Sequence, residues 1–179
     1  STHISRWGYG CSKAIDEFLA LAYFREKKLP VVIVRCFNTV GPRQTGQYGM
    51  VLPKFIKAAL LNQPLVIYGT GEQTRCFADV SDVVDAFIKL MNTPECAGEI
   101  FNVGTTESIS ITDLAQKVKD MCHSKSRIEY MRYEDAFEEG FEDMMHRQPD
   151  LTKIKNFIGL EPKHKLDHII SRIIDYYEK

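Results

Sequence analysis

A continuous run of β-branched residues places the strongest limit on how this chain folds. Residues 31–34 (VVIV) follow Leu29 and Pro30, where a helical pattern is broken, and lead directly into a polar, turn-rich segment at 35–43. A short, wholly apolar run of this kind is typical of a parallel strand covered by helices on both faces. The sequence therefore predicts an α/β fold, with ligand-binding residues at the carboxyl end of this strand.

The segment before this strand reads as a helix that carries a tyrosine and a lysine one turn apart. Apolar residues within 14–23 recur with the 3.6-residue period of a helix that buries one face. Tyr9 and Lys13 are spaced i,i+4, so both side chains leave the same face. A nearby ammonium group favours the phenolate form of a tyrosine, and a tyrosinate can act as a general base toward a substrate hydroxyl. The alternative is that Lys13 simply extends into water.

The remaining sequence alternates helical and strand patterns without a linker, a repeat or a low-complexity segment. These patterns predict helices at about 9–27, 50–62, 80–92, 111–122 and 166–178, and strands at about 30–36, 65–68, 99–103 and 127–132. Ser81 is the expected N-cap of the helix at 80–92, and Ser110 or Thr112 is that of the helix at 111–122.

Composition and charge exclude several classes of protein. The 179 residues carry a net charge of −1, with 44% hydrophobic and 26% charged residues, which is ordinary for a folded domain and not for a disordered tail. This balance offers no basic surface for nucleic acid. No apolar run approaches the roughly 18–20 residues of a membrane span, and no signal-peptide pattern is present.

Neither the cysteines nor the histidines show the spacing of a metal site. The five cysteines are scattered without C-x-x-C pairs, which predicts reduced thiols in a cytoplasmic protein. His164 and His168 are spaced i,i+4 but lack the acidic residue of a zincin motif, so we interpret them as solvated surface. The acidic stretch at 134–143 does not match an EF-hand loop and is interpreted as a solvated loop.

Several motifs follow one another along the chain. They are the YxxxK of Tyr9 and Lys13, followed by RCFNTVGPRQ at 35–44, VLPKFIKAAL at 51–60, PLVIYGTGEQTRCFADVSDVVDAFIKLM at 64–91, GEIFNVGTTESISITDLAQKV at 98–118 and RQPDLTKIKNFIGLEPK at 147–163. Over nearly its whole length, and in the order of these motifs, the chain resembles the C-terminal part of an extended short-chain dehydrogenase/reductase of the NAD-dependent nucleotide-sugar epimerase/dehydratase family. The glycine-rich GxxGxxG turn and the upstream serine or threonine of that family are not found in it. Because the chain also starts without a methionine, inside an apparent loop, we expect it to be the distal half of a longer enzyme.

The resemblance implies the distal part of a Rossmann-like, doubly wound sheet interleaved with a small α/β sugar-nucleotide lobe. Residues 1–179 would form the C-terminal part of one such unit. Within it, about 1–46 and 80–105 would belong to the nucleotide-binding core, and about 47–79 and 106–179 mainly to the substrate lobe. The family also implies a homodimer that pairs through the helix of Tyr9 and Lys13, with Phe18, Leu21 and Phe24 at the contact; alternatively these three side chains belong to the core.

The resemblance further implies roles for individual residues. Tyr9 would be the catalytic base, and Lys13 would stabilise the tyrosinate and hold the nicotinamide ribose of NAD. The residues implied to contact the cofactor are Tyr9, Lys13, Phe37 and Val40. Those implied to contact the substrate are Asn38, Lys54, Leu65, Tyr68, Arg75, Arg147 and Asp150.

Each substrate residue also has a plainer explanation. Arg75 and Arg147 would pair with a diphosphate, for which a planar guanidinium group is well suited, or else form surface ion pairs. Leu65 and Tyr68 would line the base pocket or belong to the core. Asn38 would contact a sugar hydroxyl or form an Asx-turn. Asp150 would bind a ribose or organise its loop. Lys54 stands near a position where the family often has an asparagine, so its contact is less defined.

The implied function is NAD-dependent modification of a UDP- or dTDP-hexose through a keto-sugar intermediate. Among the family's reactions we expect 4-epimerisation, with 4,6-dehydration or UDP-glucuronate decarboxylation as alternatives. A non-catalytic nucleotide-sugar-binding module is the alternative of another class. We expect the isolated chain to be inactive, and we expect neither nucleic-acid nor membrane partners.

Overall fold

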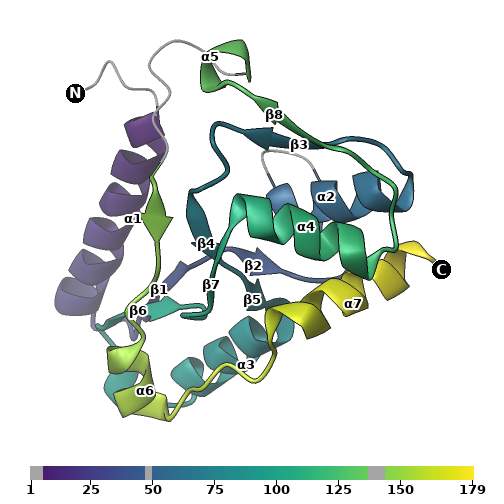
Figure 1. The fold of residues 1–179 in the computed structure, drawn as a ribbon. Coiled ribbons are helices and arrows are strands. Elements are labelled where there is room, and N and C mark those ends of the chain that lie inside the picture. The colour runs from purple at the N-terminus through teal and green to yellow at the C-terminus, as the bar shows by residue number, and fades with distance from the viewer. Residues whose placement is uncertain (1–5, 47–49, 137–143) are drawn as a thin grey trace.

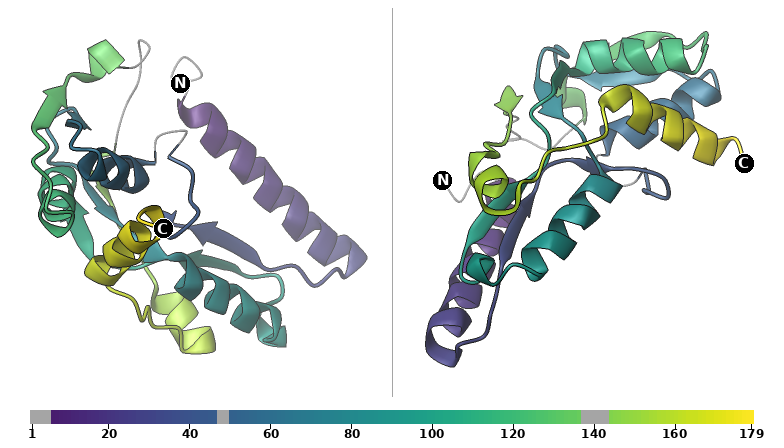
Figure 2. Two further views of the ribbon diagram at one scale, coloured as in Figure 1. Left: turned by 90° about the vertical axis from the view of Figure 1, so that its right-hand side faces the viewer. Right: turned by 90° about the horizontal axis from the view of Figure 1, so that it is seen from below.

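A parallel pair of strands forms the centre of the first layer of the fold. The structure, a computed structural model, describes residues 6–46, 50–136 and 144–179 (Figure 1). Strand β1 (Ile33–Cys36) pairs in parallel with β6 (Ile100–Val103). Helices α1 (Arg6–Lys27) and α3 (Val80–Met91) lie on opposite sides of this pair (Figure 2). The apolar run at 31–34 thus leads into a parallel strand covered on two faces, which confirms the α/β prediction.

The first layer has its own apolar core. Phe101 and Val103 of β6 pack with Ala86 and Leu90 of α3 and with Ile154 of α6 (Thr152–Ile158). Helix α6 therefore lies against the β1–β6 pair, although it follows the second layer in sequence. The short 3-10 helix η1 (Pro94–Cys96) connects α3 to β6.

The second layer is built on another parallel pair, β3 (Leu65–Tyr68) with β8 (Ile128–Met131). Helices α2 (Val51–Leu60), α4 (Ile111–Met121) and α7 (Leu166–Tyr177) surround it. Each of these helices places an apolar face on the shared core, as their 3.6-residue periodicity predicts. The largest fully buried side chains of this core are Leu52, Ile56, Leu65, Ile67, Leu114, Ile169, Ile170 and Ile173.

Short strands link the two layers. Strand β2 (Thr39–Val40) pairs in parallel with β5 (Ala78–Asp79). Strand β4 (Thr74–Cys76) lies between β7 (Ser108–Ser110), which is antiparallel to it, and β9 (His146–Arg147), which is parallel. The single-turn helix α5 (Tyr133–Ala136) follows β8. Strand β2 is the next strand after β1, and β4 is the next strand after β3. The chain segments that leave the carboxyl ends of β1 and β3 therefore come together between the two layers.

Two sequence-based expectations are corrected by the structure. Asp79, not Ser81, is the N-cap of α3, because its carboxylate accepts a hydrogen bond from the Ser81 backbone N–H at 2.8 Å. His164 is not a solvated surface residue, because its Nδ1 lies 2.9 Å from the buried Asp82 carboxylate. Ser110 caps α4, as predicted.

Charged contacts fasten α3 to the last helix of the chain. The Arg172 guanidinium in α7 donates to both carboxylate oxygens of the fully buried Asp79, at 2.9 and 2.7 Å. Asp82 accepts the backbone N–H groups of Lys163 and His164, each at 3.0 Å. The first turn of α3 therefore holds the segment that leads into α7.

Candidate functional site

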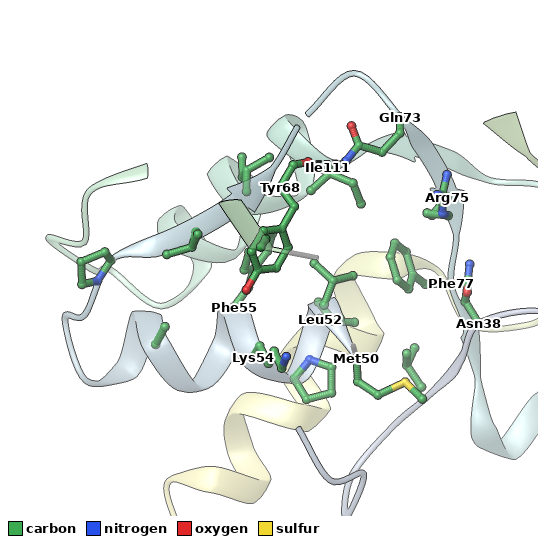
Figure 3. Close-up of a pocket in the computed structure, with 18 of the residues that line it drawn as sticks. Asn38, Met50, Leu52, Lys54, Phe55, Tyr68, Gln73, Arg75, Phe77 and Ile111 are labelled. Atoms are coloured by element: carbon green, nitrogen blue, oxygen red, sulfur yellow. Dashed lines mark hydrogen bonds between the residues drawn. The ribbon is translucent and has the colours of Figure 1, made fainter. Parts of the chain in front are cut away.

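A pocket of about 810 Å³ lies where the two layers meet. The segment after β1 contributes Asn38 and Val40, helix α2 contributes Lys54 and Phe55, and strands β3 and β4 contribute further residues. In Figure 3, Gln73, Arg75, Phe77 and Asn38 line one side of the pocket, whereas Tyr68, Phe55 and Lys54 line another. The pocket combines aromatic and aliphatic walls with a few polar groups, which is typical of small-molecule sites.

The pocket brings together five of the residues that the sequence singled out: Asn38, Val40, Lys54, Tyr68 and Arg75. Lys54 and Arg75 give it two positive groups. The Arg75 guanidinium donates to the Thr74 carbonyl oxygen at 2.7 Å, so it is held close to its own strand. The pocket thus offers cationic side chains beside apolar surface, an arrangement that suits an anionic ligand with an aromatic part.

Asn38 is held by the neighbouring strand. Its backbone has φ +23°, and its side-chain amide donates to the Cys76 carbonyl oxygen at 2.9 Å. Its own carbonyl oxygen accepts the Ala78 N–H. The observed side-chain bond therefore runs to a residue far away in sequence, whereas an Asx-turn would have bonded locally.

Arg147 lies beside Arg75 but outside the pocket lining. The two residues are partners in the parallel β4–β9 ladder. The Arg147 guanidinium lies 5.2 Å from the ring centre of Phe37, within the range of a cation–π contact. Phe37 itself packs against Gly104, where a Cβ would come within 2.9 Å of the Phe37 Cβ.

The structure places the other predicted substrate residues away from the pocket. Leu65 is fully buried in the core of the second layer. Asp150 accepts the Thr152 backbone N–H at 2.8 Å at the start of α6, and this hydrogen bond holds the pKa of the Asp150 carboxyl below its usual value. The observed contact of Asp150 is thus one that organises its loop.

Tyr9 and Lys13 form a separate, exposed pair on α1. Tyr9 is 73% exposed, and the Lys13 ammonium lies 5.8 Å from its ring centre. Lys13 donates to Asp16 at 2.9 Å, and this hydrogen bond raises the pKa of Lys13 above its usual value. The lysine therefore remains charged at neutral pH beside the phenol.

Several pocket residues were not predicted from the sequence. Gln73 lines the pocket just before β4, Tyr133 lines it from α5, and Phe77 lines it between β4 and β5. Gln73 and Tyr133 are sixty positions apart and meet only because β3 pairs with β8. In the sequence, a glutamine two residues after the Gly69–Gly71 turn is the feature that could have marked this position.

Within the described ranges, no group of three or more histidine, cysteine or acidic side chains is arranged to hold a metal ion. None of the helices in those ranges combines the length and apolar character that a membrane crossing requires. Most of the acidic stretch at 134–143, residues 137–143, lies outside the described residues.

A family model described as the NAD dependent epimerase/dehydratase family matches residues 2–104, which is more than half of the chain. The chain belongs to this family. UDP-N-acetyl-alpha-D-glucosaminuronate decarboxylase of Bacillus cytotoxicus is 39% identical to this epimerase/dehydratase-family chain over 97% of its length, and the chain covers 54% of that relative. The chain thus spans about half the length of this curated relative.

Solved structures of the family show the same fold. UDP-glucose 4-epimerase of Thermotoga maritima with UDP-glucose has a TM-score of 0.85 and 28% identity, and the match covers 95% of this family member and 53% of that structure. UDP-glucuronic acid 4-epimerase of Bacillus cereus in complex with UDP-glucuronic acid and NAD has a TM-score of 0.84 and 25% identity. This match covers 95% of the present chain and 52% of the epimerase. The epimerase/dehydratase chain therefore has the architecture of about half of these Rossmann-like enzymes.

Proposed function

We propose that this chain forms the sugar-nucleotide site of an NAD-dependent enzyme that decarboxylates a UDP-linked uronic acid. The observation that carries the proposal is the pocket itself, which has an aromatic wall and the two cations Lys54 and Arg75. A UDP-uronic acid has an aromatic base at one end, a central diphosphate and a carboxylate on the sugar. Its anionic groups match the pocket cations, and its base matches the apolar wall.

The exposed Tyr9–Lys13 face of α1 would hold the nicotinamide end of NAD. Both side chains leave one face of the helix, and the Lys13 ammonium lies 5.8 Å from the Tyr9 ring centre. When bound, NAD supplies the hydride acceptor. Tyr9 would take the proton of the sugar hydroxyl, while Lys13 would stabilise the tyrosinate and hold the ribose. Among the remaining predicted contacts, Phe37 and Val40 would pack near the cofactor from the end of β1.

The choice of reaction rests on sequence similarity and on chemistry. The 39% identical relative is named a decarboxylase of a UDP-uronic acid, whereas the two solved 4-epimerases are 28% and 25% identical. Oxidation of a uronic acid at C4 places a ketone β to the carboxylate, and such an acid loses carbon dioxide readily. The same oxidised sugar, if reduced on its other face, gives 4-epimerisation, which is the second candidate.

Calorimetric titration of the chain with UDP-glucuronic acid, UDP-glucose, dTDP-glucose and NAD⁺ tests the ligand. We expect UDP-glucuronic acid to bind more tightly than UDP-glucose and dTDP-glucose, whose sugars carry no carboxylate. Arg75→Met should weaken that binding by about tenfold, because a charge-assisted hydrogen bond is lost. Arg25→Met, an exposed arginine on α1, is the matched control. Binding of none of the sugar nucleotides would contradict the proposal.

A chimera tests the reaction. The chain would be completed with the part of the Bacillus cytotoxicus decarboxylase that it does not match, and carbon dioxide release from UDP-glucuronic acid would be measured. Tyr9→Phe should lower turnover by a factor of about 10² to 10⁴, because general base catalysis is removed, with UDP affinity unchanged. A product that keeps its carboxylate and is inverted at C4 would assign 4-epimerisation instead. Unchanged turnover in the variant would remove Tyr9 from the mechanism. A wild-type chimera that binds the sugar nucleotide without turnover would favour a binding module.

A further inference from the structure

A buried glutamine separates the pocket from a second cavity. Gln73 is 6% exposed, and both it and Tyr133 line the pocket described above and a neighbouring cavity of about 590 Å³. The two side chains therefore form part of the wall between the cavities. A buried amide needs hydrogen-bond partners, so the groups that Gln73 contacts show what it holds in place.

The Gln73 side-chain nitrogen joins three segments of the chain. It donates to the Tyr68 carbonyl oxygen at 2.9 Å and to the Tyr133 hydroxyl at 3.2 Å. Tyr68 is the last residue of β3, and Tyr133 opens α5 after β8. Gln73 itself precedes β4, two residues before Arg75. One amide group thus ties together the ends of three elements that surround the pocket.

The ring of Tyr133 also lies against Gly69. Gly69 has φ +74°, and a Cβ at this position would overlap the Tyr133 ring. Glycine is therefore required both for the backbone conformation and for the close approach of the ring. Because the hydroxyl is fixed by Gln73 and the ring rests on Gly69, the orientation of Tyr133 in the pocket wall is determined at two points.

We propose that Gln73 is a positioning residue, which fixes Tyr133 as the wall against which the nucleoside of the substrate packs. The proposal rests on the proposed function, because it takes a nucleotide as the ligand of the pocket. Tyr133 lies beside the end of β3, and Arg75 lies in β4, two residues after Gln73. The wall that Tyr133 forms is therefore next to Arg75, the residue predicted to contact the diphosphate. Gln73 therefore acts on affinity through the orientation that it gives to Tyr133.

A double-mutant cycle measured by calorimetry with UDP tests the proposal. Gln73→Leu should weaken UDP binding about tenfold and Tyr133→Phe about fivefold, the range expected for lost neutral hydrogen bonds. The double variant should bind UDP no more weakly than Gln73→Leu alone, because both changes break the same hydrogen bond between Gln73 and the Tyr133 hydroxyl. Loss of about fiftyfold in the double variant would show independent roles and overturn the proposal.

Inorganic pyrophosphate separates positioning from damage to the fold. It carries the phosphates that Arg75 would bind but has no nucleoside, so its affinity should be the same in all variants. An equal loss of pyrophosphate and UDP affinity in Gln73→Leu would mean that the lobe is disturbed, which overturns the proposal. Gln63→Leu, an exposed glutamine after α2, and Tyr130→Phe, which lines only the second cavity, are the matched controls.

The outcomes also distinguish this proposal from the function on which it rests. A wild-type chain that binds UDP while Gln73→Leu binds it equally well would overturn the role of Gln73 and leave the nucleotide site intact. A wild-type chain without affinity for UDP would overturn the nucleotide site and, with it, the role of Gln73.

Discussion

Individual side chains in this protein differ sharply in how much solvent they meet, and the five cysteines show this most clearly. Cys11 is exposed on α1, whereas Cys76 and Cys96 are fully buried. Burial, assisted by the nearby Glu178 carboxylate, raises the pKa of the Cys122 thiol to about 11. The thiolate is the reactive form of cysteine, so exposure and pKa together set the order of reaction.

We expect iodoacetamide at pH 8 to alkylate Cys11 long before Cys122. At that pH only roughly one Cys122 thiol in a thousand is ionised, given its raised pKa. A time course followed by peptide mass spectrometry measures the order, and labelling in denaturant is the control in which all five cysteines react. Equal rates for Cys11 and Cys122 would show that the α4–α7 packing around Cys122 opens freely.

At the scale of elements, the contact between α3 and α7 depends on one buried carboxylate. Burial alone would raise the pKa of Asp79, but hydrogen bonds from Ser81 and the charge of Arg172 outweigh it, and the pKa of Asp79 is lowered. A lowered folded-state pKa means that the stabilisation is fully present above the unfolded value of about 3.9 and is lost as the pH falls through the folded value. The α3–α7 contact is therefore sensitive to acid below about pH 4.

Arg172→Met should lower the free energy of unfolding at pH 7 by about 2 kcal/mol, because Asp79 is left buried without its cation. Without that cation the folded-state pKa of Asp79 rises, so the difference from wild type should shrink between pH 7 and pH 4. Urea unfolding at both pH values measures this. Lys117→Met, which breaks the exposed Lys117–Asp167 pair between α4 and α7, is the control and should cost less than about 1 kcal/mol. A pH-independent loss in Arg172→Met would contradict this account.

The elements also show what a sequence can predict. Helices α1, α3, α4 and α7 and strands β1, β3, β6 and β8 were predictable because their periodicity extends over enough residues to be read. Strands β2, β5 and β9 have only two residues each, and their extended conformation depends on partners such as Asp79 for Val40. In the same way, Arg75 and Tyr68 could be predicted as site residues because they lie in motifs that the family shares. The contact between Gln73 and Tyr133 could not be predicted, because it depends on how β3 and β8 pair.

At the scale of the whole molecule, α1 presents an uncovered apolar face. Four of its large side chains, Ile15, Phe18, Leu19 and Tyr23, are between 55% and 71% exposed. Phe24, by contrast, is partly buried and packs on Gly98, so one of the three residues predicted at the dimer contact packs within the chain. Exposed apolar side chains that cluster on one helix face are typical of surfaces that bind another protein.

We predict that the chain self-associates through this face of α1. Light scattering over a wide concentration range should show a larger species for the wild type, and Phe18→Glu should shift it toward the monomer by placing a charge in the contact. Ile88→Glu is the matched control, because Ile88 is exposed to a similar degree on α3. Dispersal by Ile88→Glu and not by Phe18→Glu would assign the contact to α3.

The ladder between β4 and β9 has a consequence for the way the two layers are held together. It sets Arg75 directly beside Arg147, two like charges on the same face of neighbouring strands, and such pairs repel. In this structure each guanidinium is turned to a different neighbour, the Thr74 carbonyl oxygen and the Phe37 ring. A dianion bound between the two guanidinium groups would cancel their repulsion and stabilise the pairing of β4 with β9. Sulfate should therefore raise the melting temperature more than chloride does at equal ionic strength. A bound anion would then contribute to the stability of the sheet itself.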